Sequence, residues 1–135
     1  MSYPITAIDG IDADAAALLK SVGIRSTARL LETARTVRGR KRLAERTKLD
    51  EKQLLRWANV ADRMRIKGIS REYAALLRVA GVDTVKELKY RNPGNLAKAM
   101  ADANKKNKLV RLLPSEKVVA RWIDSARKLP LKISY

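Results

Sequence analysis

Apolar side chains recur every three or four residues along most of the chain, and this spacing predicts α-helices. The clearest case follows Asp50, where Leu54, Trp57, Ala58 and Ala61 lie on one face of a helix. Few aromatic residues are available for an interior, so Leu, Ile, Val, Met and Ala must build it, which also favours helices. We therefore predict an all-α fold.

Residues that commonly cap helices mark where these helices begin. We expect two capping boxes, one where Asp50 is followed by Gln53 and one where Thr84 is followed by Glu87. Residues 2–7 are expected to form a short tail. The predicted N-caps are Asp12, Ser26, Asp50, Ser70, Thr84, Asn92 and Ser115.

The composition changes over residues 35–48, where seven Lys and Arg side chains accompany a single acid, Glu45. Blocks of like charge are often disordered. Leu43 and Ala44 are nevertheless spaced to dock on a neighbouring helix. We predict a short helix over residues 40–47.

An internal repeat organises the chain. Residues 66–89 align without gaps on residues 8–31, with both glycines and an Ala-Ala-Leu-Leu segment preserved. The segment around Trp122 aligns in the same way on the segment around Trp57, with seven extra residues ahead of it in the second copy. The repeat predicts two units of four helices each, residues 1–65 and 66–135. We expect the units to pack about an approximate twofold axis over one shared core, closed by a tail over residues 129–135.

Each copy has a Gly between apolar residues, then the Ala-Ala-Leu-Leu helix, then a second Gly and a Ser or Thr before a further helix. This pattern resembles the helix-hairpin-helix family of nucleic-acid-binding modules. The resemblance implies that backbone N–H groups of each hairpin hold a phosphate, and that its carbonyls often hold a monovalent cation. The family usually has a second Gly two residues after the first, where this chain has Asp12 and Ser70.

The whole chain is similar to a bacterial family of tandem helix-hairpin-helix proteins, the domain of unknown function numbered 4332. The resemblance covers the charge-rich middle segments and the recurring Trp as well as the hairpins. It implies a fold and no particular activity.

The charge balance points to a polyanionic partner. The chain has 30 Lys and Arg against 14 Asp and Glu, a formal net charge of +16. Such a surplus attracts nucleic acid or an anionic membrane surface. Sixteen of the cations are Arg, which pairs with phosphate through two parallel hydrogen bonds.

Most familiar enzyme chemistries are excluded. The chain has no Cys and no His, which removes disulfides, Cys/His zinc sites, a Cys nucleophile and a His general base. Asp9, Asp12 and Asp14 match no calcium-loop pattern, so we expect no metal and no cofactor. A Lys acting through a Schiff base stays open, because some helix-hairpin-helix domains are lyases on damaged DNA, but no single Lys stands out. We predict a protein that is not an enzyme.

No run of residues approaches the roughly 20 apolar positions of a membrane span. The first ten residues also lack the charged start and apolar block of a signal peptide. We expect no membrane partner and a location in the cytoplasm, with association with the nucleoid possible.

The two hairpins differ in charge. Lys67 and Arg71 flank the Gly of the second hairpin, whereas Asp9 and Asp12 flank that of the first. Acidic neighbours repel phosphate, so the first hairpin is interpreted as mainly structural. The second-hairpin residues predicted to contact nucleic acid are Lys67, Gly68, Ser70 and Arg71.

Two basic blocks occupy equivalent places in the two copies. Exposed Lys and Arg are often merely solvated, and this simpler interpretation stays open. The size and clustering of the charge favour contact with nucleic acid. The first block contains Arg38, Arg40, Lys41, Arg42 and Arg46, and the second contains Lys105, Lys106, Lys108 and Arg111.

Trp57 and Trp122 are aromatic side chains of the kind that stack on bases. Their helical spacing with neighbouring apolar residues instead favours a role in the core.

Taken together, these features predict a non-catalytic protein that binds nucleic acid, DNA more than RNA, through the phosphate backbone and with little sequence preference. The alternative is a helical adaptor that binds other proteins, because a fold of this kind does not settle function.

Overall fold

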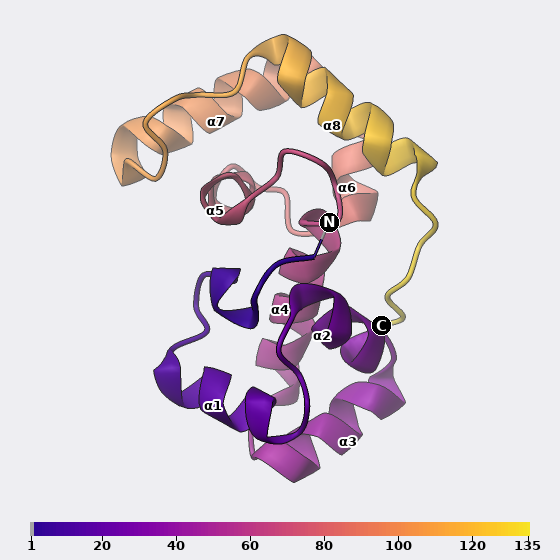
Figure 1. Ribbon diagram of the computed structural model, residues 1–135. Helices are drawn as coiled ribbons and strands as arrows, with labels where there is room; N and C mark the ends of the chain where they lie inside the picture. The colour runs from indigo at the N-terminus through magenta and orange to yellow at the C-terminus, as the bar shows by residue number, and fades with distance from the viewer. Residues whose placement is uncertain (1) are drawn as a thin grey trace.

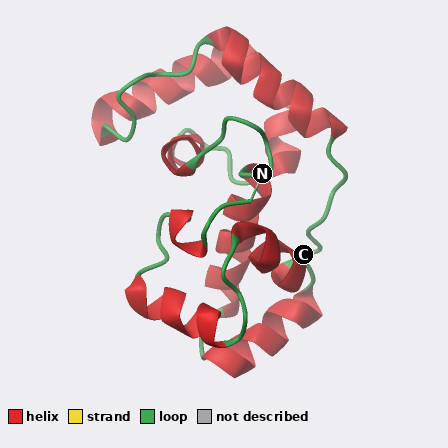
Figure 2. Cartoon of the chain, viewed as in Figure 1, coloured by secondary structure: helices red, strands yellow, loops and turns green. Residues whose placement is uncertain are grey.

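The computed structural model describes residues 2–135, and these residues form an all-helical protein, as predicted (Figure 2). Within this part of the chain no strand is found, and one isolated β-bridge pairs Pro4 with Ser26. The elements are the 3-10 helix η1 (Ile5–Ala7) and the α-helices α1 (Ala13–Ser21), α2 (Thr27–Ala34), α3 (Val37–Thr47), α4 (Glu51–Arg63), α5 (Arg71–Val79), α6 (Val85–Lys89), α7 (Pro93–Asn107) and α8 (Glu116–Lys128).

Helix α4 runs through the middle of the molecule (Figure 1). Helices α1 and α3 lie at one end, and α7 and α8 lie at the other. In the first half of the chain α2 packs on α4, and in the second half α6 packs on α8. Helix α4 also contacts α6, which joins the two halves. The predicted twofold relation between the halves stays a prediction.

Most predicted helix starts are observed. The capping box of Thr84 and Glu87 is present, and Asp12 accepts a hydrogen bond from the Ala15 N–H at 2.8 Å. The capping box predicted at Asp50 is wrong, because position 50 precedes α4 but its carboxylate makes no bond to the helix. Ser70 likewise precedes α5 without a side-chain bond to it.

The charge-rich segment is helical, and its helix begins earlier than predicted. Helix α3 starts at Val37 because the Thr36 hydroxyl accepts a hydrogen bond from the Gly39 N–H at 3.0 Å, which caps the helix there. The short tail predicted for residues 2–7 also differs from the structure. It contains η1, and Ile5 is fully buried in the core.

Two equivalent turns precede α1 and α5. We call residues 8–11 the Gly10 turn and residues 66–69 the Gly68 turn. Gly10 has a φ of 100° and Gly68 a φ of 93°, in the left-handed region that residues with a side chain rarely adopt. The same backbone requirement in both copies explains why Gly recurs there.

Both tryptophans are buried behind these turns, which confirms their predicted core role. Trp57 and Trp122 are each 2% exposed. A Cβ atom added to Gly10 would lie 3.5 Å from the Trp57 Nε1, and one added to Gly68 would lie 3.1 Å from the Trp122 Nε1. Each Trp therefore packs directly beneath the turn of its own copy.

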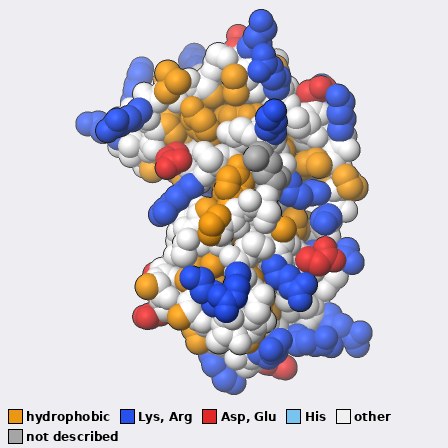
Figure 3. Space-filling view, in the orientation of Figure 1, with side chains coloured by type: hydrophobic (Ala, Val, Ile, Leu, Met, Phe, Trp, Pro, Cys, Tyr) orange, Lys and Arg blue, Asp and Glu red, His pale blue; other side chains and the backbone are white. Residues whose placement is uncertain are grey.

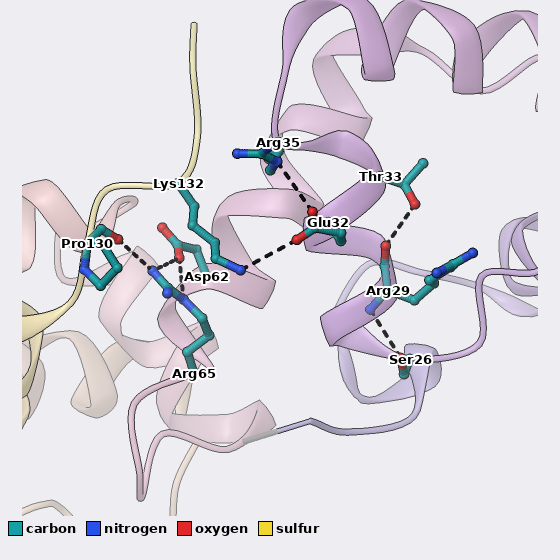
Figure 4. A network of polar contacts seen from close by, with 9 residues as sticks. All are labelled: Ser26, Arg29, Glu32, Thr33, Arg35, Asp62, Arg65, Pro130 and Lys132. Atoms are coloured by element: carbon teal, nitrogen blue, oxygen red, sulfur yellow. Dashed lines mark hydrogen bonds and ion pairs between the residues drawn. The ribbon is translucent and has the colours of Figure 1, made fainter.

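The C-terminal tail links the two ends of the molecule. After α8 it runs back to the region of α2 (Figure 1), where the Ser134 N–H donates to the Arg35 carbonyl at 2.8 Å. Lys132 pairs with Glu32 at 3.5 Å (Figure 4). The Tyr135 hydroxyl donates to the Asn59 side chain at 2.9 Å.

A partly buried ion pair lies under the same tail. Arg65 donates to the Asp62 carboxylate at 2.7 Å and to the Pro130 carbonyl at 3.3 Å (Figure 4). Burial raises the pKa of Asp62, and Arg65 opposes that shift. The buried apolar side chains of both halves form one cluster, and the division at residue 65 stays a prediction.

Candidate functional site

The Gly68 turn has an exposed centre between two buried apolar residues. Ile66 and Ile69 are buried, and the Ile69 N–H donates to the Ile66 carbonyl at 3.1 Å. Lys67 and Gly68, at the centre of the turn, are exposed. The core thus holds the turn while leaving its central peptide and one cation at the surface.

A cavity of about 340 Å³ opens beside this turn. Lys67 and Gly68 form one wall, and Arg121 of α8 contributes a second exposed cation. Trp122 also lines the cavity. Arg121 is not among the site residues predicted from the sequence, although it directly precedes the repeated Trp.

Helix α5 starts immediately after the turn with an uncapped first turn. The first N–H groups of a helix have no partner inside it, and they carry a partial positive charge. At α1 the Asp12 side chain satisfies one of these groups, whereas at α5 the Ser70 side chain satisfies none. The start of α5 is therefore free to donate to an anion.

The Gly10 turn has the same shape and the opposite chemistry. The Ile11 N–H donates to the Ile8 carbonyl at 3.3 Å, as in the other turn. Asp9 occupies the position equivalent to Lys67, and its carboxylate pairs with Arg71 of α5 at 3.4 Å. This turn therefore directs a carboxylate toward the second half of the molecule.

The first basic block lies on α3, and most of it is exposed. Arg40 is the exception, at 5% exposed. Its guanidinium donates to the carbonyls of Ala34 at 2.8 Å and Ser134 at 2.6 Å, and burial lowers its pKa. Arg40 therefore holds the C-terminal tail and is removed from the predicted interface. The exposed members of this block are Arg38, Lys41, Arg42 and Arg46.

The second basic block lies at the end of α7 and in the loop after it. All four members are exposed: Lys105, Lys106, Lys108 and Arg111. The Asn104 side chain orders this loop by accepting from the N–H groups of Leu109 and Val110 at 2.9 and 3.0 Å. The Tyr73 hydroxyl of α5 donates to the Leu112 carbonyl at 2.8 Å. The loop is thereby held against the start of α5.

The two blocks do not form one surface. Helix α3 and the C-terminal end of α7 lie at opposite ends of the molecule (Figure 1). Figure 3 shows Lys and Arg side chains in several separate groups, at both ends of this face. Arg111 lines a cavity with Glu72 and Tyr73 of α5, so the second block lies near the start of α5, which follows the Gly68 turn. The first block, on α3, is distant from that turn.

The fold and its turns define a class of all-helical protein that carries a repeated sequence unit with a glycine turn and a buried Trp in each copy. The chain belongs to the family described as Domain of unknown function (DUF4332), which matches residues 9–129 and confirms the predicted resemblance to that family. The resemblance to helix-hairpin-helix modules stays a prediction. No curated protein and no solved structure matches the chain. Among the helices of residues 2–135, none is long and apolar enough to cross a membrane.

Proposed function

We propose that this protein binds nucleic acid, DNA more than RNA, through phosphate contacts and without catalysis. The observation that carries the proposal is the Gly68 turn, where Lys67 and Arg121 line one accessible cavity and the uncapped start of α5 follows shortly after in the chain. Phosphates commonly bind at helix N-termini and beside clustered cations.

In this proposal the Gly68 turn and the helices on either side of it act as a helix-hairpin-helix. One phosphate accepts hydrogen bonds from the first N–H groups of α5, and Lys67 and Arg121 neutralise its charge. Arg71 adds a third cation once it leaves Asp9, and an exposed ion pair of this kind costs little to break.

The second basic block extends the contact along the nucleic-acid backbone, because its loop is held against α5 by Tyr73. The exposed cations of α3 lie at the far end of the molecule and would meet a separate stretch of nucleic acid. None of these contacts reads a base edge, so sequence preference is expected to be small.

Fluorescence anisotropy with labelled duplex DNA at several salt concentrations tests the proposal. Neutralising about five phosphates gives a slope of log K against log salt of about −4 to −5, at about 0.9 per phosphate. Duplex RNA and single strands serve as comparison ligands. An affinity that does not change with salt, or the absence of binding to every DNA and RNA, would contradict the proposal.

The absence of catalysis is part of the proposal and has its own test. A lyase forms a Schiff base between a Lys and an abasic sugar, which borohydride traps covalently. We expect no trapped product on abasic DNA. The proposal also implies a location with nucleic acid, in the cytoplasm or on the nucleoid.

One observation favours the alternative of a protein-binding adaptor. Leu112 is 76% exposed and its neighbour Leu113 is 41% exposed, in the loop before α8. Figure 3 shows further hydrophobic side chains around the α7 end of the molecule. Purification from lysate with and without nuclease separates the two functions, because protein partners that survive nuclease favour the adaptor.

A further inference from the structure

Helices α4 and α5 place two rows of cations around one cleft. On α4, Lys52, Arg56 and Arg63 follow each other at spacings of four and seven residues, which puts them on one face of the helix. On α5, Arg71 and Arg78 are seven residues apart and also share a face. These five side chains line two adjoining cavities, which together we call the arginine cleft.

The cleft is large enough for a small ligand. Its cavities have volumes of about 310 and 120 Å³ and share the side chains of Arg56, Val60, Arg63 and Arg78. Pockets that bind small molecules typically measure about 300 to 1,000 Å³. The walls combine the cations with apolar side chains such as Val60.

Arg63 is a buried cation that makes no close ion pair. It is 1% exposed, and no carboxylate within residues 2–135 lies at ion-pair distance from it. Its guanidinium donates to the carbonyls of Asp83 and Ala74, while its Nε has no hydrogen-bond partner. Burial lowers its pKa to about 10, so it is still charged at neutral pH. The carboxylates of Asp83, Asp62 and Glu87 offset only part of the effect of burial on this pKa. A buried charge without a close ion pair destabilises the fold, and an anion in the cleft would offset this cost.

The rest of the cleft leaves positive charge unmatched. Two carboxylates line it, Asp9, which pairs with Arg71 at 3.4 Å, and Asp83. Across the described residues, Arg56, Arg78 and Lys52 form no ion pair. Five cations and two carboxylates therefore line the cleft, which leaves a surplus of positive charge there.

We propose that the arginine cleft binds an oligophosphate group, carried either by free inorganic oligophosphate or by a nucleoside triphosphate. Guanidinium groups match phosphate oxygens through two parallel hydrogen bonds. The cations of α4 extend over about 16 Å at about 1.5 Å per residue, so one phosphate meets only part of the row whereas a chain of phosphates meets several. The cleft shares only Arg71 with the phosphate site proposed beside the Gly68 turn, and the inference does not depend on nucleic-acid binding.

Isothermal titration calorimetry of the full chain with sodium tripolyphosphate, in the absence of divalent cations, tests this site. We expect one tripolyphosphate per chain and an affinity about 10- to 100-fold weaker in the variant Arg56→Gln with Arg78→Gln. The control, Lys20→Gln with Arg25→Gln, removes the same charge from exposed positions of the first copy and should change the affinity by less than about twofold. No binding by the unmodified protein, or equal losses in the two variants, would overturn the proposal.

Thermal unfolding supplies a second measurement that does not require a fully stable variant. Tripolyphosphate should raise the Tm of the unmodified protein and of the control, and should raise the Tm of the Arg56→Gln, Arg78→Gln variant much less. Equal Tm increases in all three proteins would count against the cleft.

Two further ligands identify the source of the phosphates. ATP that binds as tightly as tripolyphosphate indicates recognition of the phosphate chain alone, and much tighter binding of ATP indicates a nucleotide; either result supports the site. Duplex DNA is the third ligand. If the Arg56→Gln, Arg78→Gln variant loses DNA affinity and tripolyphosphate fails to bind, the cleft belongs to the nucleic-acid path and the small-ligand proposal is wrong.

Discussion

The Gly10 and Gly68 turns share one backbone shape and carry opposite charges. Both have a glycine at positive φ and a Trp packed beneath it. Asp9 stands in one where Lys67 stands in the other, and α1 is capped by a carboxylate where α5 is left uncapped. The core preserves the turn in both copies, while the exposed residues around it are free to differ because packing does not constrain them.

The largest expected effect concerns what the two copies share. Trp57→Ala and Trp122→Ala should each lower the free energy of unfolding by about 3 to 5 kcal/mol, because a large buried side chain is lost and a cavity remains. The loss should be greater for Trp122, whose ring also contacts that of Tyr73 with centroids 5.3 Å apart. Urea unfolding followed by circular dichroism measures both, and a cost below about 1 kcal/mol for either would contradict the core role.

The next effect concerns what distinguishes the copies. Lys67→Glu with Arg71→Glu should weaken DNA binding by about 30-fold or more, because two cations at the Gly68 turn become anions. Asp9→Ala with Asp12→Ala should change it by about twofold or less, and in the direction of tighter binding, because Arg71 loses its carboxylate partner. Anisotropy titrations at one salt concentration measure both variants.

A charge-matched control keeps that comparison specific. Lys20→Glu with Arg25→Glu makes the same change in net charge on exposed positions of the first copy. It should weaken DNA binding much less than the change at the Gly68 turn. Equal losses at the two places would show that only the overall charge matters, and equal losses for the paired turn variants would refute the asymmetry.

A smaller effect compares the glycines. Gly10→Ala and Gly68→Ala both force a side chain into the left-handed region, at a cost of about 1 to 2 kcal/mol. Gly68→Ala should cost more, because its new Cβ would lie 3.1 Å from the Trp122 Nε1, against 3.5 Å for Gly10→Ala and Trp57. Urea unfolding of the two variants decides the order, and a larger loss for Gly10→Ala would contradict the packing argument.

The smallest effect compares the two caps. Asp12→Ala removes a hydrogen bond to the Ala15 N–H and should cost about 1 kcal/mol of stability. Ser70→Ala removes no cap bond and should be nearly neutral. Equal losses in thermal unfolding would show that Ser70 caps α5 in solution, which would also weaken the proposed phosphate site there.

Much of the fold was predictable because it depends on local spacing. The helices, the four-residue turns and the buried tryptophans follow from apolar periodicity and from glycine at repeated positions. The site was less predictable. Arg40 was assigned to the interface with its block, but it shares a face of α3 with Leu43 and Thr47, and all three are buried. The helical spacing between Arg40 and Leu43 could have predicted that Arg40 is buried.

No pattern in the amino-acid sequence predicts the arginine cleft. Each row of cations is an ordinary exposed helix face until α4 and α5 are placed together. The same is true of the pair between Asp9 and Arg71, which joins residues far apart in the chain. Arg121 reaches the Gly68 turn for the same reason, because α8 packs against that turn through Trp122.

The sequence by itself determined the all-helical fold, the repeat, the glycine turns and the surplus of positive charge, because these depend on residues that are close in the chain or on composition. Only the tertiary structure decided which cations are buried, which are paired and which face one another. The physical reason is that burial and electrostatic interaction depend on distance in space, and that distance is set when helices far apart in the chain pack together.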